Sequence, residues 1–226
     1  NQIIYTKNAD KRLSPASSMK LFPAAASLYH FAPNHHFETS LSYADKNVYL
    51  TFSGAPALTT DNLIELLAQL KEHHSLIEGD LVLDTSRFKP PYYPDGTSYD
   101  DLGWYFAAPD TAAILNENAA TYLFISAKQD HAPIQIKPKN TEHALTLINQ
   151  VITVNQEEEK NHCGLHLELM ADNTMRLFGC LAKHDQPKTM RLAIPDPILY
   201  AKHTVQQLLE QNSITLKGRI ISGHTP

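Results

Sequence analysis

The sequence has 226 residues, of which 42% are hydrophobic and 19% charged, and its net charge is −5. This composition is ordinary for a globular protein and excludes an intrinsically disordered chain. The modest negative charge, with no run of Lys or Arg longer than two residues, argues against nucleic acid and anionic membranes as partners. No apolar run approaches the roughly 20 residues needed to cross a bilayer.

The N-terminal segment lacks the features of a secretory signal peptide, because residues 1–10 contain no basic region followed by an apolar stretch. Gln2 to Thr6 instead has the pattern of a strand, so we expect that a preceding stretch has been removed. The two cysteines, Cys163 and Cys180, are compatible with an oxidising or a reducing compartment.

Several helices are predicted along the chain. An Ala-rich helix reaches about Tyr29, and Pro23 should bend it because proline removes one backbone hydrogen bond. A second helix is predicted with Thr60 or Asp61 as its cap, and four leucines recur in it at helical spacing: Leu63, Leu66, Leu67 and Leu70. Further helices are predicted from Thr141 to Ile152 and from Asp196 to about Gln211, the last with Asp196 as its cap and Pro197 at its first position.

The predicted strands are scattered between these helices: residues 37–50 (one or two strands), 80–84, 122–126, 165–169, 175–181 and 216–222. Residues 89–101 are rich in Pro, Tyr, Asp and Gly and predict a loop, and residues 156–161 predict a charged surface turn. Strands and helices without regular βαβ alternation indicate an α+β fold.

The hairpin around Asp172 and Asn173 has two possible registers. A tight two-residue turn would place Cys163 diagonal to Cys180 and allow a disulfide. A five-residue loop would pair Leu169 with Met175, Leu167 with Leu177 and Leu165 with Gly179, which stacks the apolar side chains on one face. In that register the alternation directs the two cysteines to opposite faces, so we predict two free thiols.

The sharpest chemical signal is Ser17-x-x-Lys20. Three residues apart on a helix, these side chains share one face. A serine hydroxyl is a weak nucleophile until a base removes its proton, and a lysine with a lowered pKa can be that base. At a helix start, free N–H groups favour an oxyanion. On the motif alone, the simpler interpretation is a helix cap at Ser17 and a solvated Lys20.

The surrounding sequence resembles a known family. The run from Asn8 to Leu21 (NADKRLSPASSMKL) is similar to the nucleophile segment of the low-molecular-mass class C penicillin-binding proteins, the peptidase S13 family. Further similar blocks follow in the family order: residues 37–39 (FET), 53–59 (SGAPALT), 79–84, 101–109, 115–118 (LNEN) and 193–200 (AIPDPILY).

The resemblance implies a fold and a domain order. It implies part of a penicillin-recognising, serine transpeptidase-like (β-lactamase-like) domain that is interrupted by a large inserted α+β region. Residues 1–38 would carry the S-x-x-K part of the active-site domain, residues 39–186 the inserted region, and residues 187–226 the return toward the active-site domain. The family motifs S-x-N and K-T-G do not occur in these 226 residues, so we expect an N-terminal fragment that is inactive by itself.

The resemblance also implies an activity, which is D-Ala-D-Ala carboxypeptidase or endopeptidase action on peptidoglycan stem peptides in the bacterial periplasm or at the cell surface. Ser17 would be acylated, Lys20 would act as the base, and β-lactams would acylate the same serine without any cofactor. By position, Asp101 would bind the free amine of diaminopimelate and Phe106 would pack along its aliphatic part. Two departures from the family pattern are Ala55, in place of the usual Asp, and Thr97-Ser98-Tyr99, in place of a common Gly-Trp.

Other polar residues are interpreted as structural. The histidines, including His162 and His166 on one predicted strand face, predict no metal site, because Cys163 points away from them. Asn116, Glu117 and Asn118 are interpreted as structural hydrogen-bonding residues. Two other functions share the S-x-x-K motif. A serine β-lactamase or esterase would lack the inserted region, and a non-catalytic peptidoglycan-binding or scaffold protein would keep Ser17 and Lys20 idle.

Overall fold

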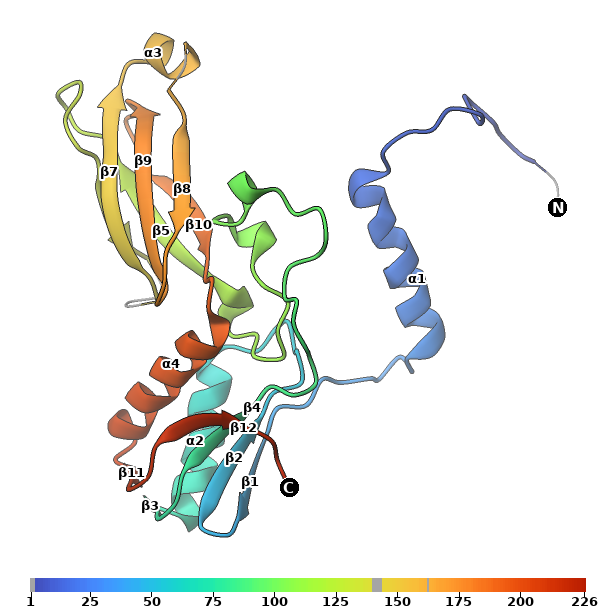
Figure 1. Cartoon of the computed structure of the whole chain (residues 1–226), viewed down its shortest axis with the longest axis vertical. Helices are drawn as coiled ribbons and strands as arrows, with labels where there is room; N and C mark the ends of the chain where they lie inside the picture. The colour runs from blue at the N-terminus through green and yellow to red at the C-terminus, as the bar shows by residue number, and fades with distance from the viewer. Residues whose placement is uncertain (1–2, 140–143, 162) are drawn as a thin grey trace. The chain divides into compact units, whose positions relative to one another are not determined.

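The computed structural model describes residues 3–139, 144–161 and 163–226 (Figure 1). The chain forms two units, Asn1–Phe37 and Glu38–Pro226. Within the described ranges, no helix combines the length and the hydrophobicity that a membrane crossing requires.

The first unit contains a short 3-10 helix, η1 (Ala16–Lys20), which continues into α1 (Leu21–His30). Residues 3–6 form no strand, so the prediction for Gln2 to Thr6 is wrong where the structure describes it. A strand needs a partner for its backbone groups, and none of these residues pairs with a described strand. Pro23 is the third residue of α1, in its first turn, where proline is tolerated best, so the predicted bend is not required.

One end of the second unit is a four-stranded sheet of β1 (Ser40–Ala44), β2 (Asn47–Thr51), β4 (Leu81–Asp84) and β12 (Ile220–Gly223), in that order. The first pair is antiparallel, and β4 is parallel to both of its neighbours. All four residues of β4 are buried, as is usual for a parallel strand in the middle of a sheet. The predicted strand over residues 216–222 is divided here between β12 and the two-residue β11 (Thr215–Leu216), which pairs with β3 (Leu76–Ile77).

Helices α2 (Thr60–His73) and α4 (Pro197–Gln211) lie at this end of the unit (Figure 1). The cap of α2 is Thr59, one residue before the predicted Thr60, because Thr59 has an extended backbone and its side chain accepts a hydrogen bond from the Asn62 N–H. The predicted cap of α4 is confirmed, since the Asp196 carboxylate accepts the N–H of Leu199 at 2.9 Å and Pro197 follows it.

The other end of the second unit is made of two three-stranded sheets. One contains β10 (Lys188–Ala193), β5 (Ala119–Ile125) and β6 (Gln135–Pro138), and the other contains β7 (Thr146–Val154), β9 (Thr174–Ala182) and β8 (Leu165–Leu169). The helix predicted from Thr141 to Ile152 is therefore wrong from Thr146 onward, and residues 141–143 lie outside the described ranges. The segment is rich in β-branched residues and pairs with β9 along its whole length, so tertiary pairing outweighs the helical spacing of its apolar residues.

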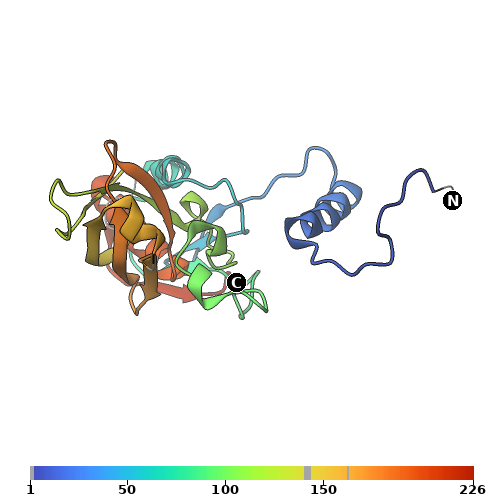
Figure 2. The ribbon, with the colours of Figure 1, turned by 90° about the horizontal axis from the view of Figure 1, so that it is seen from above.

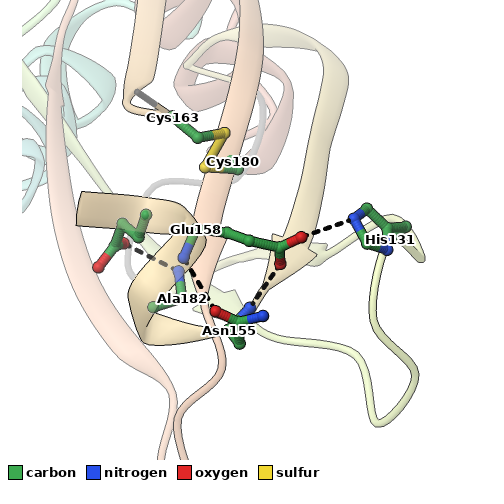
Figure 3. Close-up of a disulfide and its surroundings, with 7 residues drawn as sticks. His131, Asn155, Glu158, Cys163, Cys180 and Ala182 are labelled. Atoms are coloured by element: carbon green, nitrogen blue, oxygen red, sulfur yellow. Dashed lines mark hydrogen bonds and ion pairs between the residues drawn. A yellow bond between two sulfur atoms is a disulfide. The ribbon is translucent and has the colours of Figure 1, made fainter. Parts of the chain in front are cut away.

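The hairpin of β8 and β9 has the register of the longer loop, with Leu169 opposite Met175 and Leu165 opposite Gly179. The prediction of two free thiols is nevertheless wrong, because Cys163 and Cys180 form a disulfide with their Cα atoms 5.6 Å apart (Figure 3). Cys163 precedes the first residue of β8, so strand alternation does not fix its direction.

Gly179 explains the close approach of the two chains beside the disulfide. Its φ of +96° lies in the left-handed region, and a Cβ on it would come within 2.0 Å of the Gly164 carbonyl oxygen. The irregular backbone at Gly179 breaks the alternation on which the prediction depended, and the N–H of Cys180 donates to the Gly164 carbonyl at 3.3 Å.

The predicted surface turn at residues 156–161 is a short helix, α3 (Gln156–Lys160), beside the disulfide (Figure 3). Asn155 caps it by accepting the N–H groups of Glu157 and Glu158. Glu159 accepts the N–H of Ala182 at 2.8 Å, which fixes the helix to the end of β9.

The overall class is α+β, as predicted. The fully buried large side chains come from both ends of the second unit and include Phe52, Leu63, Leu81, Leu115, Phe124, Met175, Leu177 and Leu192. Residues 187–226 supply β10, α4 and β12 to this unit. The assignment of residues 1–38 and 187–226 to one active-site domain remains a prediction.

Candidate functional site

Ser17 and Lys20 both lie on η1, at the start of the helical segment of the first unit. In a 3-10 helix, side chains three residues apart are eclipsed, so these two side chains project on the same side. Pro15 precedes the helix, and the N–H of Ser18 donates to its carbonyl at 2.9 Å. Both side chains are exposed.

Helix α1 carries its large apolar side chains on one side, including Leu21, Phe22, Leu28 and Tyr29, which are 71–95% exposed. No residue from 3 to 37 is buried. An apolar side of this width is typical of a helix that packs against the core of a domain. The helix that follows Ser17 and Lys20 therefore has the composition of a core helix.

Asp101 ends the 3-10 helix η2 (Tyr99–Asp101) in the second unit and is half-buried. Its carbonyl accepts the N–H of Trp104 at 2.9 Å, which begins the turn into η3 (Tyr105–Ala107). This loop runs beside β8, as both ribbon views show (Figures 1 and 2). Gly103 makes that approach possible, because it has no side chain and a Cβ on it would clash with Leu167. Its carbonyl also accepts the N–H of Ala193 at 2.9 Å.

Phe106 lies on η3 and lines an open cleft of about 1100 Å³. The cleft extends from the first turn of α2 to β10, and its walls include Thr59, Asp61, Asp110 and Thr121. The Phe106 ring meets the Tyr105 ring edge to face, with centroids 5.6 Å apart. Asp101 does not line this cleft.

A left-handed turn forms the floor of the cleft. Asn116, Glu117 and Asn118 have φ values of 51°, 60° and 48°, all in the left-handed region. Both asparagine side chains hold the turn. Asn118 Oδ1 accepts the N–H of Leu115 at 3.0 Å, and Asn116 Nδ2 donates to the hydroxyl of Tyr200 at 2.8 Å.

The interpretation of these residues as structural is confirmed for the two asparagines. Asn116 also joins the turn to α2, because its Nδ2 donates to Thr60 Oγ1 at 2.8 Å and its Oδ1 accepts the Thr60 N–H at 3.1 Å. The cleft floor is thus connected to the start of α2 and to α4.

Glu117, between the asparagines, differs from them because its side chain forms an ion pair instead of holding the turn. Its Oε2 lies 2.9 Å from the guanidinium of Arg191 on β10. The same guanidinium lies over the ring of Tyr105, 4.7 Å from the centroid. Arg191, from β10, thus meets Tyr105 and Glu117, which are 74 or more residues earlier in the chain, and an aromatic ring, a cation and a carboxylate come together at the cleft wall.

The structure divides the predicted site residues into three places. Ser17 and Lys20 share one helix of the first unit, Phe106 lines the cleft of the second, and Asp101 lies outside that cleft on the same loop. Sequence reasoning gave no role to Tyr105 and Arg191 and interpreted Glu117 as structural, although the asparagines around Glu117 are residues that tolerate a left-handed turn. His162 lies outside the described residues, and no group of three His, Cys, Asp or Glu side chains that could hold a metal is found among those described.

Comparison with known proteins extends this picture. The chain matches the D-Ala-D-Ala carboxypeptidase 3 (S13) family over residues 1–226. It is 29% identical over 235 residues to the D-alanyl-D-alanine carboxypeptidase DacB of Haemophilus influenzae, covering 100% of this chain and 49% of that protein. It is 24% identical over 242 residues to the D-alanyl-D-alanine carboxypeptidase of Actinomadura sp. (strain R39), covering 99% of this chain and 44% of that one.

Two solved structures are similar over most of the chain. Penicillin binding protein 4 (dacB) from Haemophilus influenzae superposes with a TM-score of 0.87 at 28% identity, covering 100% of this chain and 51% of that one. The same protein complexed with a novel beta-lactam superposes with a TM-score of 0.72 at 25% identity, covering 94% and 47%. The chain therefore spans about half the length of the relatives that it matches, and it shares their α+β penicillin-recognising fold.

Proposed function

Because the chain belongs to the D-Ala-D-Ala carboxypeptidase 3 (S13) family, we propose that the whole protein is a serine-type D-Ala-D-Ala carboxypeptidase and endopeptidase of peptidoglycan stem peptides. The observation that carries this proposal is the pair Ser17 and Lys20, three residues apart on η1, within a chain that matches the family from end to end. The apolar helix α1 supports it, since such a helix suits the interior of an active-site domain.

The proposed reaction is acyl transfer in two steps. Lys20 removes the proton of the Ser17 hydroxyl, and Ser17 Oγ forms a bond to the carbonyl carbon between the two terminal D-alanines. The C–N bond breaks, and D-Ala leaves after taking up that proton. Water then hydrolyses the ester, which releases the shortened stem peptide and restores Ser17. Endopeptidase action is the same sequence with a cross-linked D-amino acid as the leaving group.

Substrate selection is proposed for two residues of the second unit. The Asp101 carboxylate would pair with a free amine on the stem-peptide side chain, and Phe106 would pack along the methylene groups that carry this amine. The exposure of Phe106 on η3 supports a role in contact with a ligand. Peptidoglycan lies outside the cytoplasmic membrane, so the protein would act there, in the periplasm or at the cell surface.

The test is covalent labelling of the whole natural protein with a fluorescent penicillin, since a β-lactam is attacked by the same serine. We expect the label on Ser17, complete loss of labelling in Ser17→Ala, and full labelling in the control Ser18→Ala. These 226 residues alone, which contain neither S-x-N nor K-T-G, should label weakly.

Two results would contradict the proposal. Peptide mapping that places the penicillin on another residue would overturn the assignment of Ser17. A whole protein that binds stem peptides but neither cleaves them nor reacts with penicillin would be a non-catalytic peptidoglycan-binding protein instead.

A further inference from the structure

The cleft that Phe106 lines has an aromatic wall in contact with solvent. Tyr105 is 45% exposed and Phe106 64% exposed, and the two rings stand edge to face. Large aromatic side chains are usually buried or used in binding, because each carries a large apolar surface. A pair of rings at an angle presents two flat faces to whatever occupies the cleft.

A hydrogen-bond donor stands beside these rings. The Arg191 guanidinium is fixed on one side by Glu117, at 2.9 Å, and on another by the ring of Tyr105, at 4.7 Å. A guanidinium has five N–H donors in a rigid plane, so the ion pair leaves others directed elsewhere. Held in this way, Arg191 loses little conformational freedom when a ligand oxygen accepts from it.

The conformation of Glu117 indicates that this arrangement serves more than stability. A non-glycine residue in the left-handed region carries a cost of about 1–2 kcal/mol, which Asn or Gly would largely avoid. The side chain of Glu117 is 66% exposed, and an ion pair at such a position contributes about 0–1 kcal/mol. The carboxylate therefore adds little to the free energy of unfolding, but it orients Arg191 toward the cleft.

Hydrogen-bond acceptors also line the cleft. Asp61 and Asp110 contribute carboxylates, and Thr121 contributes a hydroxyl. No side-chain hydrogen bond of these three residues is found in the part of the chain that the structure describes. The ligand must therefore offer both donors and acceptors, together with an apolar face for the rings.

We propose that this cleft binds the glycan strand of peptidoglycan through its N-acetylated hexosamine units. A sugar ring has an apolar C–H face that packs on aromatic rings, hydroxyls that donate to carboxylates, and an acetamido carbonyl that accepts from Arg191. A cationic peptide could bind to the carboxylates. Arg191, which can only donate hydrogen bonds, would then face a group of its own charge. The cleft volume, about 1100 Å³, slightly exceeds the roughly 300–1,000 Å³ typical of small-molecule sites and has room for more than one sugar ring.

The choice of this particular sugar rests on the proposed function, because the stem peptide is covalently attached to the glycan strand. Phe106 is assigned to the stem peptide and also lines this cleft, so the two parts of one polymer would lie next to each other. Saccharide binding would hold the polymer while its peptide reacts elsewhere.

The experiment is a titration of the protein with tetra-N-acetylchitotetraose, with maltotetraose as the sugar that lacks acetamido groups. Trp104, the single tryptophan of the chain, directly precedes Tyr105 and reports binding by its fluorescence, and calorimetry gives the affinity. We expect saturable binding of the acetylated sugar alone. Tyr105→Leu and Arg191→Met should each weaken it by about tenfold, the scale of one aromatic contact or one charged hydrogen bond.

Arg176→Met is the matched control, because Arg176 also pairs with a glutamate, Glu168, and also lies over an aromatic ring, that of Phe178, but outside the cleft. This variant should bind the sugar as the unchanged protein does. Absence of binding, or equal weakening by Arg176→Met, overturns the inference. A stem peptide that binds through Tyr105 and Arg191, without any saccharide binding, would make the cleft a peptide site and overturn it too.

Penicillin labelling and saccharide titration, both carried out on the whole natural protein, separate this inference from the proposed function. Labelling of Ser17 without saccharide binding would overturn the glycan site alone. Saccharide binding without labelling would overturn the proposed catalysis and leave the glycan site in place.

Discussion

The backbone of Gly103 lies directly against the side chain of Leu167, so that a Cβ at Gly103 would come within 2.6 Å of the Leu167 Cβ. Leu167 is a buried residue of β8, and Gly103 lies between Asp101 and Phe106 on the loop assigned to substrate. The position of this loop therefore depends on the absence of one methyl group.

Gly103→Ala should lower the free energy of unfolding by about 1–3 kcal/mol, as overpacking of a filled core does. It should also displace the loop and change the Trp104 fluorescence. Thermal unfolding and fluorescence spectra measure both effects. Gly164→Ala is the control, because its nearest neighbour would be a His166 atom at 3.8 Å and it should be tolerated. Equal stability of the two variants would contradict the packing argument.

Asp101→Asn should reduce turnover of stem peptides that carry a free side-chain amine by about tenfold, because one charge-assisted hydrogen bond becomes a neutral one. Simple acyl-D-Ala-D-Ala substrates, which lack the amine, should be cleaved as before. Asp100→Asn removes the same charge from the adjacent, exposed position and should change neither rate. Equal loss on both substrates would mean that Asp101 has a structural role.

The disulfide predicts the thiol content of the folded protein. Alkylation under denaturing conditions without reductant should give no adduct by intact mass, and prior reduction should give two. Replacing both Cys163 and Cys180 by Ser should lower stability by about 3 kcal/mol, because the bond joins residues 17 apart and restricts the unfolded chain. Reductant should destabilise the natural protein but leave the double variant unchanged. Two adducts without reductant would disprove the bond.

Asp84 should make the stability of the second unit sensitive to acid. Burial alone would raise the pKa of this carboxyl group, but hydrogen bonds from Ser86, at 3.0 Å, and Thr225, at 2.7 Å, outweigh burial and hold the pKa well below its ordinary value. Because the folded pKa is the lower one, the stabilisation is complete at neutral pH. It is lost as the pH falls below about 4, the ordinary value for Asp, toward the folded pKa.

Asp84→Asn should therefore lower the free energy of unfolding at pH 7 by about 1–3 kcal/mol and flatten its decline in acid. Urea unfolding at several pH values measures this. Asp45→Asn removes the same charge from the exposed turn between β1 and β2 and should leave the acid dependence as it is. An unchanged pH profile in Asp84→Asn would show that the carboxylate contributes nothing.

Local signals predicted much of this fold. The leucine spacing of α2, the cap at Asp196 and the apolar alternation of β8 all depend on neighbouring residues, and the structure agrees with each. The β7 strand and the disulfide depend on distant partners instead. The pairing of β7 with β9 overrides a helical pattern, and the backbone at Gly179 breaks an alternation that the prediction had to assume.

The candidate site shows the same difference between local signals and distant partners. Ser17 and Lys20 were predicted from a motif, and Asp101 and Phe106 from their position in a block similar to the family; both signals are local in sequence. The contact of Arg191 with Glu117 and Tyr105 joins residues 74 positions apart or more, and nothing near Arg191 in the sequence indicates it. Only the fold creates such a group.

The place of β12 has a consequence for how the protein is made. β4 can pair with β2 once residues 47–84 are synthesised, but its other edge pairs with β12, and the N–H of Thr225 donates to Asp84 across 141 residues of chain. Until residues 220–223 have been synthesised, one edge of the apolar strand β4 stays unpaired. Another chain can then pair with that edge. Slowing translation after residue 200 should therefore prolong the exposure of this edge and increase aggregation.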